Sequence, residues 1–488
     1  MSTEHLADLD DMRNLSREET SALKCLKLIQ HYKWLLDAFV LDFFTENHWG
    51  LLPLSWRETL HDTSLEELGS WISMTESKCE RVWPLSLLSL RASVKALSIP
   101  RSQLDLSDPS NINSGGVTSL KKTLRAGMET ECLRHENLRQ LFVRHVKPKK
   151  QHETVVMAKL CAKAALDSNV TCVVDVGGGK GHLTRLLSYG YGLDVCCVEA
   201  QSDLISSARE IDKKIEYTAS KYLGKSYVDT LPCPEYIDIT VGRSDEALHQ
   251  FRELVFNKLN KNSDETVSFG IVGLHPCGDL AATLLHLFLN LNEAKFICIA
   301  SCCYMKLSCN PCDELRSYPL SNFFLALPEE LTNLSYEALE LSCHALEAYC
   351  QRLEKQQYEV LKIHCYRAVL EKLITKYNPE MKRIGLRSVK HFDEMDFSTY
   401  ATRALNRIDV IIPPTEMTSP DTVQKLERWK DVVVLYTLRL LLAPLVETAV
   451  IWDRLLFIQE SGVSGLVIPG FDPVLSPRNL ILKGLKPK

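Results

Sequence analysis

The stretch Cys172-Val-Val-Asp-Val-Gly-Gly-Gly-Lys-Gly-His-Leu-Thr184 decides the fold class of this chain. Its first five residues are apolar except for one aspartate, which is typical of a buried strand. Glycines then stand at alternate positions after Asp175, namely Gly177, Gly179 and Gly181. Glycine adopts backbone angles that other residues avoid, and it lets a ligand approach the main chain closely. The stretch therefore predicts a strand, a tight turn and a helix whose first N–H groups are free to bind a ligand.

The spacing of these glycines separates two classes of nucleoside cofactor. A dinucleotide fingerprint requires a third small residue at position 182, where this chain has a histidine. An acid followed by glycines two, four and six positions later instead resembles the first motif of class I methyltransferases. The next apolar run ends at Glu199, where a carboxylate can accept hydrogen bonds from ribose hydroxyls. A turn that binds no ligand is the structural alternative. We predict an S-adenosyl-L-methionine site formed by Asp175, Gly177, Gly179, Gly181, His182 and Glu199.

Strands and helices alternate after residue 150, which predicts an α/β fold with a mostly parallel sheet and helices on both faces. A helix at 153–166 and strands near 172–176, 194–198, 237–241, 269–274 and 296–300 support this fold. Two short strands at 465–469 and 479–483 are placed to complete one edge of the sheet. The predicted organisation is an α-helical N-terminal domain (1–100), a linker or mobile loop (101–117), the first part of the catalytic domain (118–330), a helical insertion (331–430), and a C-terminal helix with the strand pair (431–488).

The composition of the 488 residues is that of a globular protein, with 45% hydrophobic and 24% charged residues. The net charge of −5 does not indicate a protein that binds RNA or DNA. The 17 cysteines and an acidic N-terminus without an apolar signal region predict reduced thiols and an intracellular, cytoplasmic protein. Charge is uneven, since residues 101–160 carry eleven Lys or Arg against six Asp or Glu. The basic cluster is densest at Arg144, Lys147, Lys149 and Lys150, and it predicts either a solvated face or a lip that attracts phosphates.

The apolar segment 432–452 is long enough to cross a bilayer. Arg439, Pro444 and Glu447 lie inside it, and one charge near a helix centre costs roughly 2.5–3.5 kcal/mol on insertion. We therefore favour a buried helix and keep membrane contact as the alternative.

Two polar turns follow the predicted strands 269–274 and 296–300. In open parallel sheets, ligands bind beyond the carboxyl ends of the strands, so both turns should face the methyl acceptor. The first turn lacks the Asn/Asp-Pro-Pro-Tyr pattern of adenine N6 methylation. His275 or Asp279 can accept a proton, and a cysteine can act as a nucleophile for pyrimidine C5 if its pKa is lowered. Residues that only form the turns are the alternative. The catalytic candidates are His275, Cys277, Asp279, Cys302, Cys303 and Tyr304.

A metal site is the other interpretation of the thiols, through Cys302, Cys303, Cys309 and Cys312. Cys309 and Cys312 have the spacing of one zinc knuckle, but no second knuckle follows at zinc-finger spacing. We therefore predict no metal.

Several further motifs have no general structural explanation. With the glycine loop at 174–183 they are Gly273-Leu-His-Pro-Cys-Gly-Asp-Leu280, Cys302-Cys-Tyr-Met-Lys-Leu-Ser308, Tyr318-Pro-Leu320, Cys343-His-Ala-Leu-Glu347, His364-Cys-Tyr-Arg-Ala368 and Leu475-Ser-Pro-Arg-Asn-Leu480. Together they resemble the methyltransferase-like protein 25 family over roughly 145–488. The resemblance implies a class I methyltransferase fold, a cofactor site on the glycine loop, and a pocket wall at Lys147-Pro-Lys-Lys-Gln-His-Glu153. The His-x-Cys-Gly and Cys-Cys turns are also similar to those of tRNA 2′-O-methyltransferases, which implies RNA as an acceptor.

Three function classes stay open at this point. A methyltransferase acting on RNA agrees with the basic lip at 144–150. A protein methyltransferase agrees with the overall acidity and the large helical additions. A cofactor-binding scaffold without catalysis agrees with the lack of an obvious acid–base pair.

Overall fold

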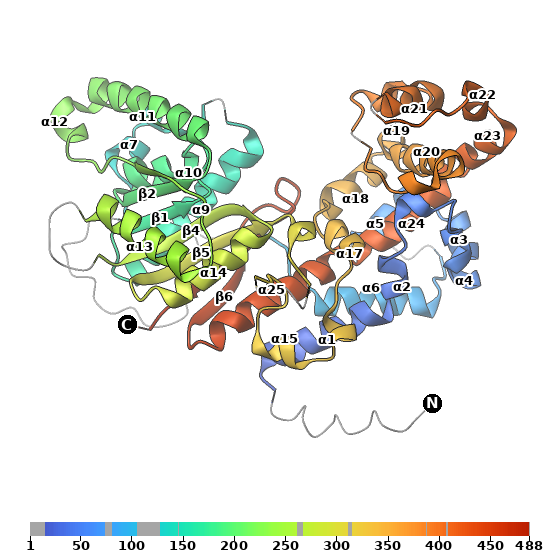
Figure 1. Ribbon diagram of the computed structural model, residues 1–488, viewed down its shortest axis with the longest axis horizontal. Coiled ribbons are helices and arrows are strands. Elements are labelled where there is room, and N and C mark those ends of the chain that lie inside the picture. The colour runs from blue at the N-terminus through green and yellow to red at the C-terminus, as the bar shows by residue number, and fades with distance from the viewer. Residues whose placement is uncertain are drawn as a thin grey trace. The chain divides into compact units, whose positions relative to one another are not determined.

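The computed structural model describes residues 15–73, 81–104, 127–144, 146–260, 267–310, 315–386, 388–406 and 408–487. They divide into two compact units (Figure 1). The sheet unit contains the described residues of 1–22, 100–333 and 449–488, and the helical unit those of 23–99 and 334–448. Most of the predicted linker, from residue 105 onward, lies outside the described residues.

A sheet of seven strands, counted over the described residues, forms the centre of the sheet unit in the order β3-β2-β1-β4-β5-β7-β6. The first five strands are parallel, and β7 runs antiparallel to both β5 and β6. The predicted mostly parallel α/β sheet is confirmed, and the C-terminal strand pair completes one edge. The strands are β1 (Cys172–Val176), β2 (Asp194–Glu199), β3 (Glu235–Asp238), β4 (Phe269–Cys277), β5 (Ala294–Cys302), β6 (Ser464–Pro469) and β7 (Leu480–Leu485).

The order of the strands reverses between β1 and β4. The chain passes from β1 to β2 and β3 on one side, and β4 and β5 lie on the other side of β1. In parallel sheets, ligands bind beyond the carboxyl ends of the strands at such a reversal. The glycine loop follows β1 directly, so the topology places this loop at the expected binding crevice.

Helices cover both faces of this sheet. On one face, α13 (Asp245–Leu259), α14 (Asp279–Asn290) and the end of α25 (Ala443–Gln459) contribute Phe251, Leu284 and Ile458 to the core. On the other face, α9 (Pro148–Asp167) and the start of the helix after the glycine loop contribute Met157 and Leu183. These buried apolar residues stabilise the sheet and fix the loops at its carboxyl edge. The helices of this unit are α7 (Glu131–Arg134), α8 (Glu136–Val143), α9 (Pro148–Asp167), α10 (His182–Arg185) with the π-helical turn η6 (Leu186–Gly190), α11 (Ser202–Leu223), α12 (Lys225–Val228), α13 (Asp245–Leu259), α14 (Asp279–Asn290), η7 (Tyr304–Lys306), α15 (Asn322–Ala326) and α16 (Glu329–Thr332).

Among the strand boundaries that differ from the sequence expectation, those of β3, β4 and β5 lie at the carboxyl edge of the sheet. β3 covers 235–238 and not 237–241, because its pairing with β2 ends at Glu199 and Asp238. β4 and β5 each continue beyond the predicted end, as far as Cys277 and Cys302, which lie side by side in the ladder. The register shifts between Leu274 and Cys277, so the polar turn is a distorted end of β4.

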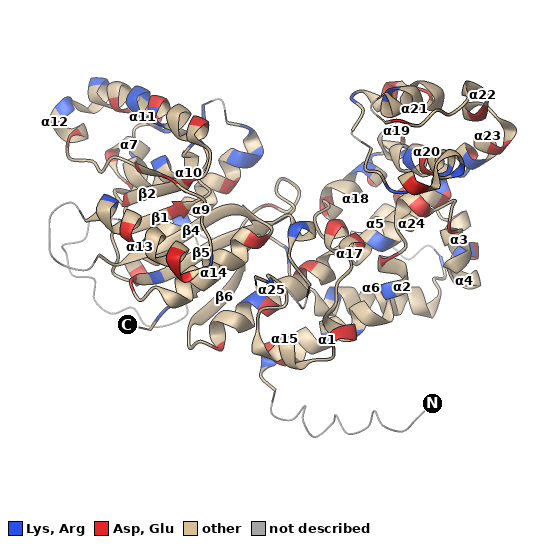
Figure 2. Cartoon of the chain, viewed as in Figure 1, with Lys and Arg blue, Asp and Glu red and all other residues tan. Residues whose placement is uncertain are grey.

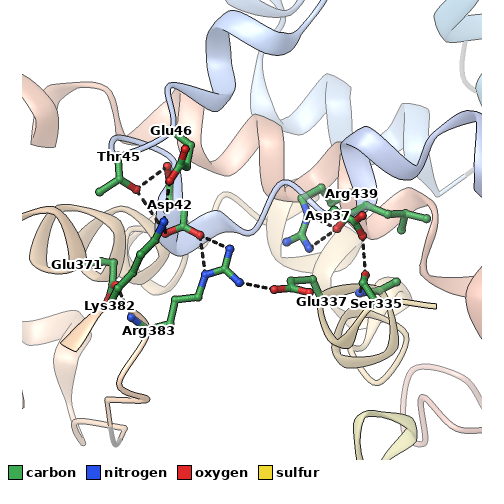
Figure 3. A network of polar contacts seen from close by, with 12 residues as sticks. Asp37, Asp42, Thr45, Glu46, Ser335, Glu337, Glu371, Lys382, Arg383 and Arg439 are labelled. Carbon is green, nitrogen blue, oxygen red and sulfur yellow. Dashed lines mark hydrogen bonds and ion pairs between the residues drawn. The ribbon is translucent and has the colours of Figure 1, made fainter. Parts of the chain in front are cut away.

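The helical unit joins two parts of the chain that the sequence interpretation described separately, the N-terminal helices and the insertion. Polar contacts link these parts (Figure 3). The guanidinium of Arg383 lies 2.7 Å from Asp42 through Nε and also contacts Glu337, and Lys382 lies 2.7 Å from Glu46. The unit contains α2 (Lys33–Leu36), η4 (Val40–Asp42), α3 (His48–Leu51), α4 (Leu54–Asp62), α5 (Leu65–Ile72), α6 (Leu85–Leu97), α17 (Tyr336–Leu341), α18 (Leu346–Glu354), α19 (Tyr358–Leu361), α20 (Ile363–Tyr377), η8 (Pro379–Met381), η9 (Phe392–Glu394), α21 (Phe397–Leu405), α22 (Pro414–Met417), α23 (Pro420–Glu427) and α24 (Trp429–Leu441).

Two helices, α1 (Arg17–His31) and α25 (Ala443–Gln459), contain residues assigned to both units. The apolar segment 432–452 lies in α24 and α25. By length and composition alone this stretch passes as a membrane span, but its apolar window is completely buried inside the protein. Arg439 is also buried and donates a hydrogen bond of 2.7 Å to the carbonyl of Leu36. The charge inside the segment is therefore accommodated by backbone carbonyls within the helical unit.

Candidate functional site

The glycine loop presents bare main chain to open space. Gly177, Gly179 and Gly181 have φ angles of 72°, 59° and 67°, in the left-handed region that favours glycine. A Cβ atom added at Gly179 would meet nothing within 4 Å, and one at Gly177 would meet only Leu280 at 3.5 Å. A ligand can therefore lie against this backbone in space that side chains would otherwise fill.

Two glycines of the loop are needed for packing. A Cβ at Gly178 would lie 2.6 Å from Sγ of Cys197, and one at Gly181 would lie 2.8 Å from the hydroxyl of Tyr236. Both distances are too short for a real Cβ contact. The sequence analysis missed Gly178, because its requirement comes from β2 and not from the spacing of the motif.

Glu199 ends β2 and its carboxylate contacts the loop. Oε2 accepts a hydrogen bond of 2.9 Å from the N–H of Gly179, and Oε1 accepts from the N–H groups of Ala200 and Gln201 at 3.0 and 3.1 Å. Each carboxylate oxygen has two lone pairs, so one acceptor position remains on Oε2. In this arrangement the carboxylate can accept from one further hydroxyl, whereas the sequence analysis expected two ribose hydroxyls.

Asp175 lies buried beneath the loop. Its Oδ2 accepts a hydrogen bond of 2.6 Å from the hydroxyl of Thr184 in α10. Burial raises the pKa of Asp175 to about 6, although the hydrogen bond from Thr184 opposes this shift. The side chain therefore anchors the helix to the strand, and its charge acts on the loop from below.

A buried ion pair holds the far end of the loop. Arg185 donates a 2.8 Å hydrogen bond to the carbonyl of Gly181, and its Nε lies 2.7 Å from Oδ1 of Asp212. The hydroxyl of Tyr236 donates to Oδ2 of Asp212 at 2.6 Å. The sequence analysis missed this set, because its members come from α10, α11 and β3 and meet only in the fold.

His182 is the first residue of α10 and follows the loop directly. Burial lowers its pKa to about 4, and the positive charges of Arg185 and Lys150 add to this effect. The imidazole is therefore neutral at physiological pH.

A second group of contacts surrounds Glu153 of α9, in the segment that the family resemblance implies to be a wall. Its Oε2 lies 2.9 Å from Nε2 of His275, and its Oε1 accepts a 2.5 Å hydrogen bond from the hydroxyl of Ser476. Lys149 lies 3.6 Å from the same Oε1. Glu153 thus joins the end of β4 to the segment before β7.

The two remaining catalytic candidates that carry side-chain oxygen, Asp279 and Tyr304, lie in different surroundings. Asp279 accepts two hydrogen bonds from Ser308, one of 2.8 Å from the N–H and one of 2.6 Å from the hydroxyl. Burial opposes ionisation, but these hydrogen bonds prevail and the pKa of Asp279 is lowered. Asp279 is therefore a weak base. Tyr304 is fully buried, with the guanidinium of Arg454 5.7 Å from its ring.

Three of the candidate thiols gather at the ends of β4 and β5. The Sγ atoms of Cys277, Cys302 and Cys303 all lie within 4.8 Å of one another, and those of Cys277 and Cys302 are 3.1 Å apart. The contact with Cys302 lowers the pKa of Cys277, which is the condition the sequence analysis set for a nucleophile. Cys309 is not part of this group, and Cys312 lies outside the described residues.

The basic lip lies at the start of α9. Arg144, Lys147 and Lys150 are exposed, while Lys149 is half-buried near Glu153. The charge of Lys150 acts on both Asp175 and His182, so this lysine lies beside the glycine loop. Elsewhere, basic and acidic residues are interspersed along the helices (Figure 2).

One further polar residue at this edge was missed. Asp238 is the last residue of β3, is exposed, and stands opposite Glu199 in the ladder. The rule that ligands bind at the carboxyl ends of strands would have identified it, had the end of β3 been predicted correctly.

The sheet order, the switch point and the glycine loop define the fold of a class I methyltransferase. In agreement, residues 149–310 match the family model described as a methyltransferase domain.

Over most of its length the chain is similar to two curated proteins, both named "Probable methyltransferase-like protein 25". It is 23% identical to that of Mus musculus, over 92% of this chain and 93% of that protein. It is 22% identical to that of Homo sapiens, over 92% of this chain and 94% of that protein. The resemblance to the methyltransferase-like protein 25 family is thereby confirmed, and the chain contains a methyltransferase domain.

Proposed function

We propose that this chain transfers a methyl group from S-adenosyl-L-methionine to RNA. The observation that carries the cofactor assignment is the open backbone at Gly177 and Gly179, with a carboxylate oxygen of Glu199 at its rim. A flat nucleoside with an amino-acid tail fits a surface of this kind, because no Cβ keeps it away from the main chain.

The electrostatics of the loop suit this cofactor. The bound group supplies an activated methyl on a positively charged sulfonium. Asp175 and Glu199 provide negative charge at the ends of β1 and β2, and the first N–H groups of α10 and the charge of Lys150 suit a carboxylate. Asp238 offers a further acceptor beyond β3.

RNA is the acceptor favoured by the basic lip. Arg144, Lys147 and Lys150 are exposed, and the charge of Lys150 acts on Asp175 and His182 at the two ends of the glycine loop. Phosphate backbones bind such groups with release of counterions. The chain as a whole has a net charge of −5, so this local excess stands out against an acidic background.

His275 is the residue best placed to accept a proton from the acceptor. Its Nε2 faces a carboxylate oxygen of Glu153 at 2.9 Å, which favours the tautomer with hydrogen on Nε2. Nδ1 is then the acceptor. The chain contributes mainly orientation and proximity to the transfer, with Glu153 as a positioning residue.

Calorimetric titration with S-adenosyl-L-methionine and with S-adenosyl-L-homocysteine tests the cofactor assignment. We expect the full-length protein to bind both, and Asp175→Ala with Glu199→Ala to abolish binding. If the folded wild-type protein binds neither, the proposal is wrong.

Labelling of cell extract with tritiated S-adenosyl-L-methionine tests the acceptor. We expect label that disappears after RNase treatment and survives protease. Label that survives RNase and disappears with protease would make the chain a protein methyltransferase. Binding without any transfer would leave a cofactor-binding scaffold.

A further inference from the structure

The thiols at the ends of β4 and β5 are closer than packing requires. Sulfur atoms in van der Waals contact stand about 3.6 Å apart, whereas Sγ of Cys277 and Sγ of Cys302 are separated by 3.1 Å. Sγ of Cys303 completes a triangle in which every side is at most 4.8 Å. Cys302 is buried, Cys303 is half-buried and Cys277 is exposed, so the burial of hydrophobic side chains does not by itself explain why the three sulfur atoms converge.

The backbone holds this triangle in place. Cys277 and Cys302 are partners in the parallel ladder, so their Cα atoms are fixed by the sheet. Cys303 follows with a φ of 53°, an uncommon angle for a residue with a side chain. Gly278 follows Cys277 directly, at the end of β4. It cannot be replaced freely, because a Cβ there would lie 2.7 Å from the carbonyl of Lys306. Two unusual backbone positions therefore flank the three thiols.

The dimensions suit a thiophilic ion. Zinc binds thiolate at about 2.3 Å in a tetrahedron, which places ligand sulfurs about 3.8 Å apart. The three Sγ atoms bracket this spacing, with one separation of 3.1 Å and all within 4.8 Å.

The charges around the three thiols also suit a zinc ion. Three thiolates around a divalent ion have a net charge of −1. His275 and Lys306 act electrostatically on Cys277, and the buried Arg454 acts on Cys302, so positive groups offset this charge. No acidic residue among those the structure describes belongs to the cluster.

We propose that Cys277, Cys302 and Cys303 bind one zinc ion. Among the described residues, no fourth His, Cys, Asp or Glu joins the group. Three protein ligands leave one coordination position for an exogenous ligand, which is the arrangement of catalytic zinc sites. Cys277 is exposed, so this position is accessible from solvent at the carboxyl edge of the sheet. The ligand set differs from the one considered in the sequence analysis, because Cys277 takes the place of Cys309 and Cys312.

Metal content tests this site independently of cofactor binding and methyl transfer. The full-length protein, purified without chelators, is analysed by plasma mass spectrometry. We expect close to one zinc per chain, and a small fraction of that for Cys302→Ser or Cys303→Ser. Cys309→Ser is the matched control, since Cys309 is a neighbouring thiol outside the cluster, and we expect it to retain the ion.

Cobalt substitution tests the site in the wild-type protein, so its result does not depend on whether a serine variant folds. Wild-type protein loaded with Co²⁺ should show thiolate-to-cobalt charge transfer and the intense visible bands of tetrahedral coordination. Wild-type protein that binds neither ion, or mass spectrometry showing a Cys277–Cys302 disulfide in freshly purified protein, would overturn the proposal. Equal metal loss in Cys309→Ser would overturn the ligand assignment.

Discussion

Replacing Gly179 by alanine separates cofactor binding from folding. A Cβ at this position meets no protein atom within 4 Å, so the substitution creates no clash in the free protein. The new methyl group instead enters the space in which we place the cofactor. Gly462 offers a matched control in the same unit, because it has a φ of 76° and its Cβ would also meet nothing within 4 Å. It precedes β6, at the edge of the sheet remote from β1.

The two substitutions should have the same effect on stability and different effects on binding. Alanine in the left-handed region costs about 1–2 kcal/mol. For a unit of this size, that is a fall of about 2–8 °C in Tm for either variant. A methyl group forced into a close contact costs about 1–3 kcal/mol, so Gly179→Ala should weaken cofactor binding about 5- to 150-fold. Gly462→Ala should leave the affinity unchanged.

Differential scanning calorimetry gives the two Tm values, and isothermal titration with S-adenosyl-L-methionine gives the affinities. The reasoning fails if Gly179→Ala binds the cofactor as tightly as the wild type does. It also fails if Gly462→Ala loses affinity to the same extent, because the effect would then report general destabilisation.

Three further predictions concern charges around the loop. Burial raises the pKa of Asp175 from 3.8 to about 6, so ionisation of this carboxyl lowers the free energy of unfolding between pH 4 and 6. We expect Asp175→Asn to remove this contribution, as measured by urea unfolding at several pH values. An unfolding free energy that changes with pH in the same way for both proteins would contradict the prediction. Glu199→Gln loses an acceptor for the N–H of Gly179 and should weaken cofactor binding by about 1–3 kcal/mol in calorimetry, with unchanged affinity as the contrary result. Arg144→Glu with Lys147→Glu should weaken RNA binding and flatten its dependence on salt, measured by fluorescence anisotropy, whereas an unchanged slope would show that the basic lip does not contact phosphates.

Local patterns were sufficient to predict the centre of the sheet unit. The run from 172 to 199 contains an apolar strand, glycines at fixed spacing and an acid after the second strand, and each of these features depends on neighbours in sequence. The C-terminal strand pair was also predicted from local composition, and the structure places it at the sheet edge. The ends of strands were inaccurate, since a strand ends where its neighbour stops pairing, and the helix predicted at 153–166 begins earlier, at Pro148.

Contacts between distant segments could not be predicted in the same way. The pairing of Arg185 with Asp212, and the position of Tyr236 above Gly181, depend on the packing of three separate elements. The same limit applies to the helical unit, where residues near Asp42 meet those near Arg383. Helical periodicity shows which face of a helix is apolar, but it contains no information about which helix covers that face.

The strand pair β6–β7 follows the helical unit in sequence, and it returns the chain to the sheet of the sheet unit. The contacts of Glu153 give this return a structural role. This carboxylate binds His275 at the end of β4 and Ser476 in the segment before β7, while the neighbouring His152 accepts a 2.9 Å hydrogen bond from the N–H of Asp472. The segment between β6 and β7 therefore contacts α9 as well as connecting two strands. Lys149 at 3.6 Å is the third group near this carboxylate. A buried carboxylate that loses one of its hydrogen-bond partners is poorly solvated, so we expect the orientation of His275 to depend on the return of the chain to the sheet. The strand pair thus has two roles: it covers the edge of β5, and it fixes the imidazole that we assign to proton transfer.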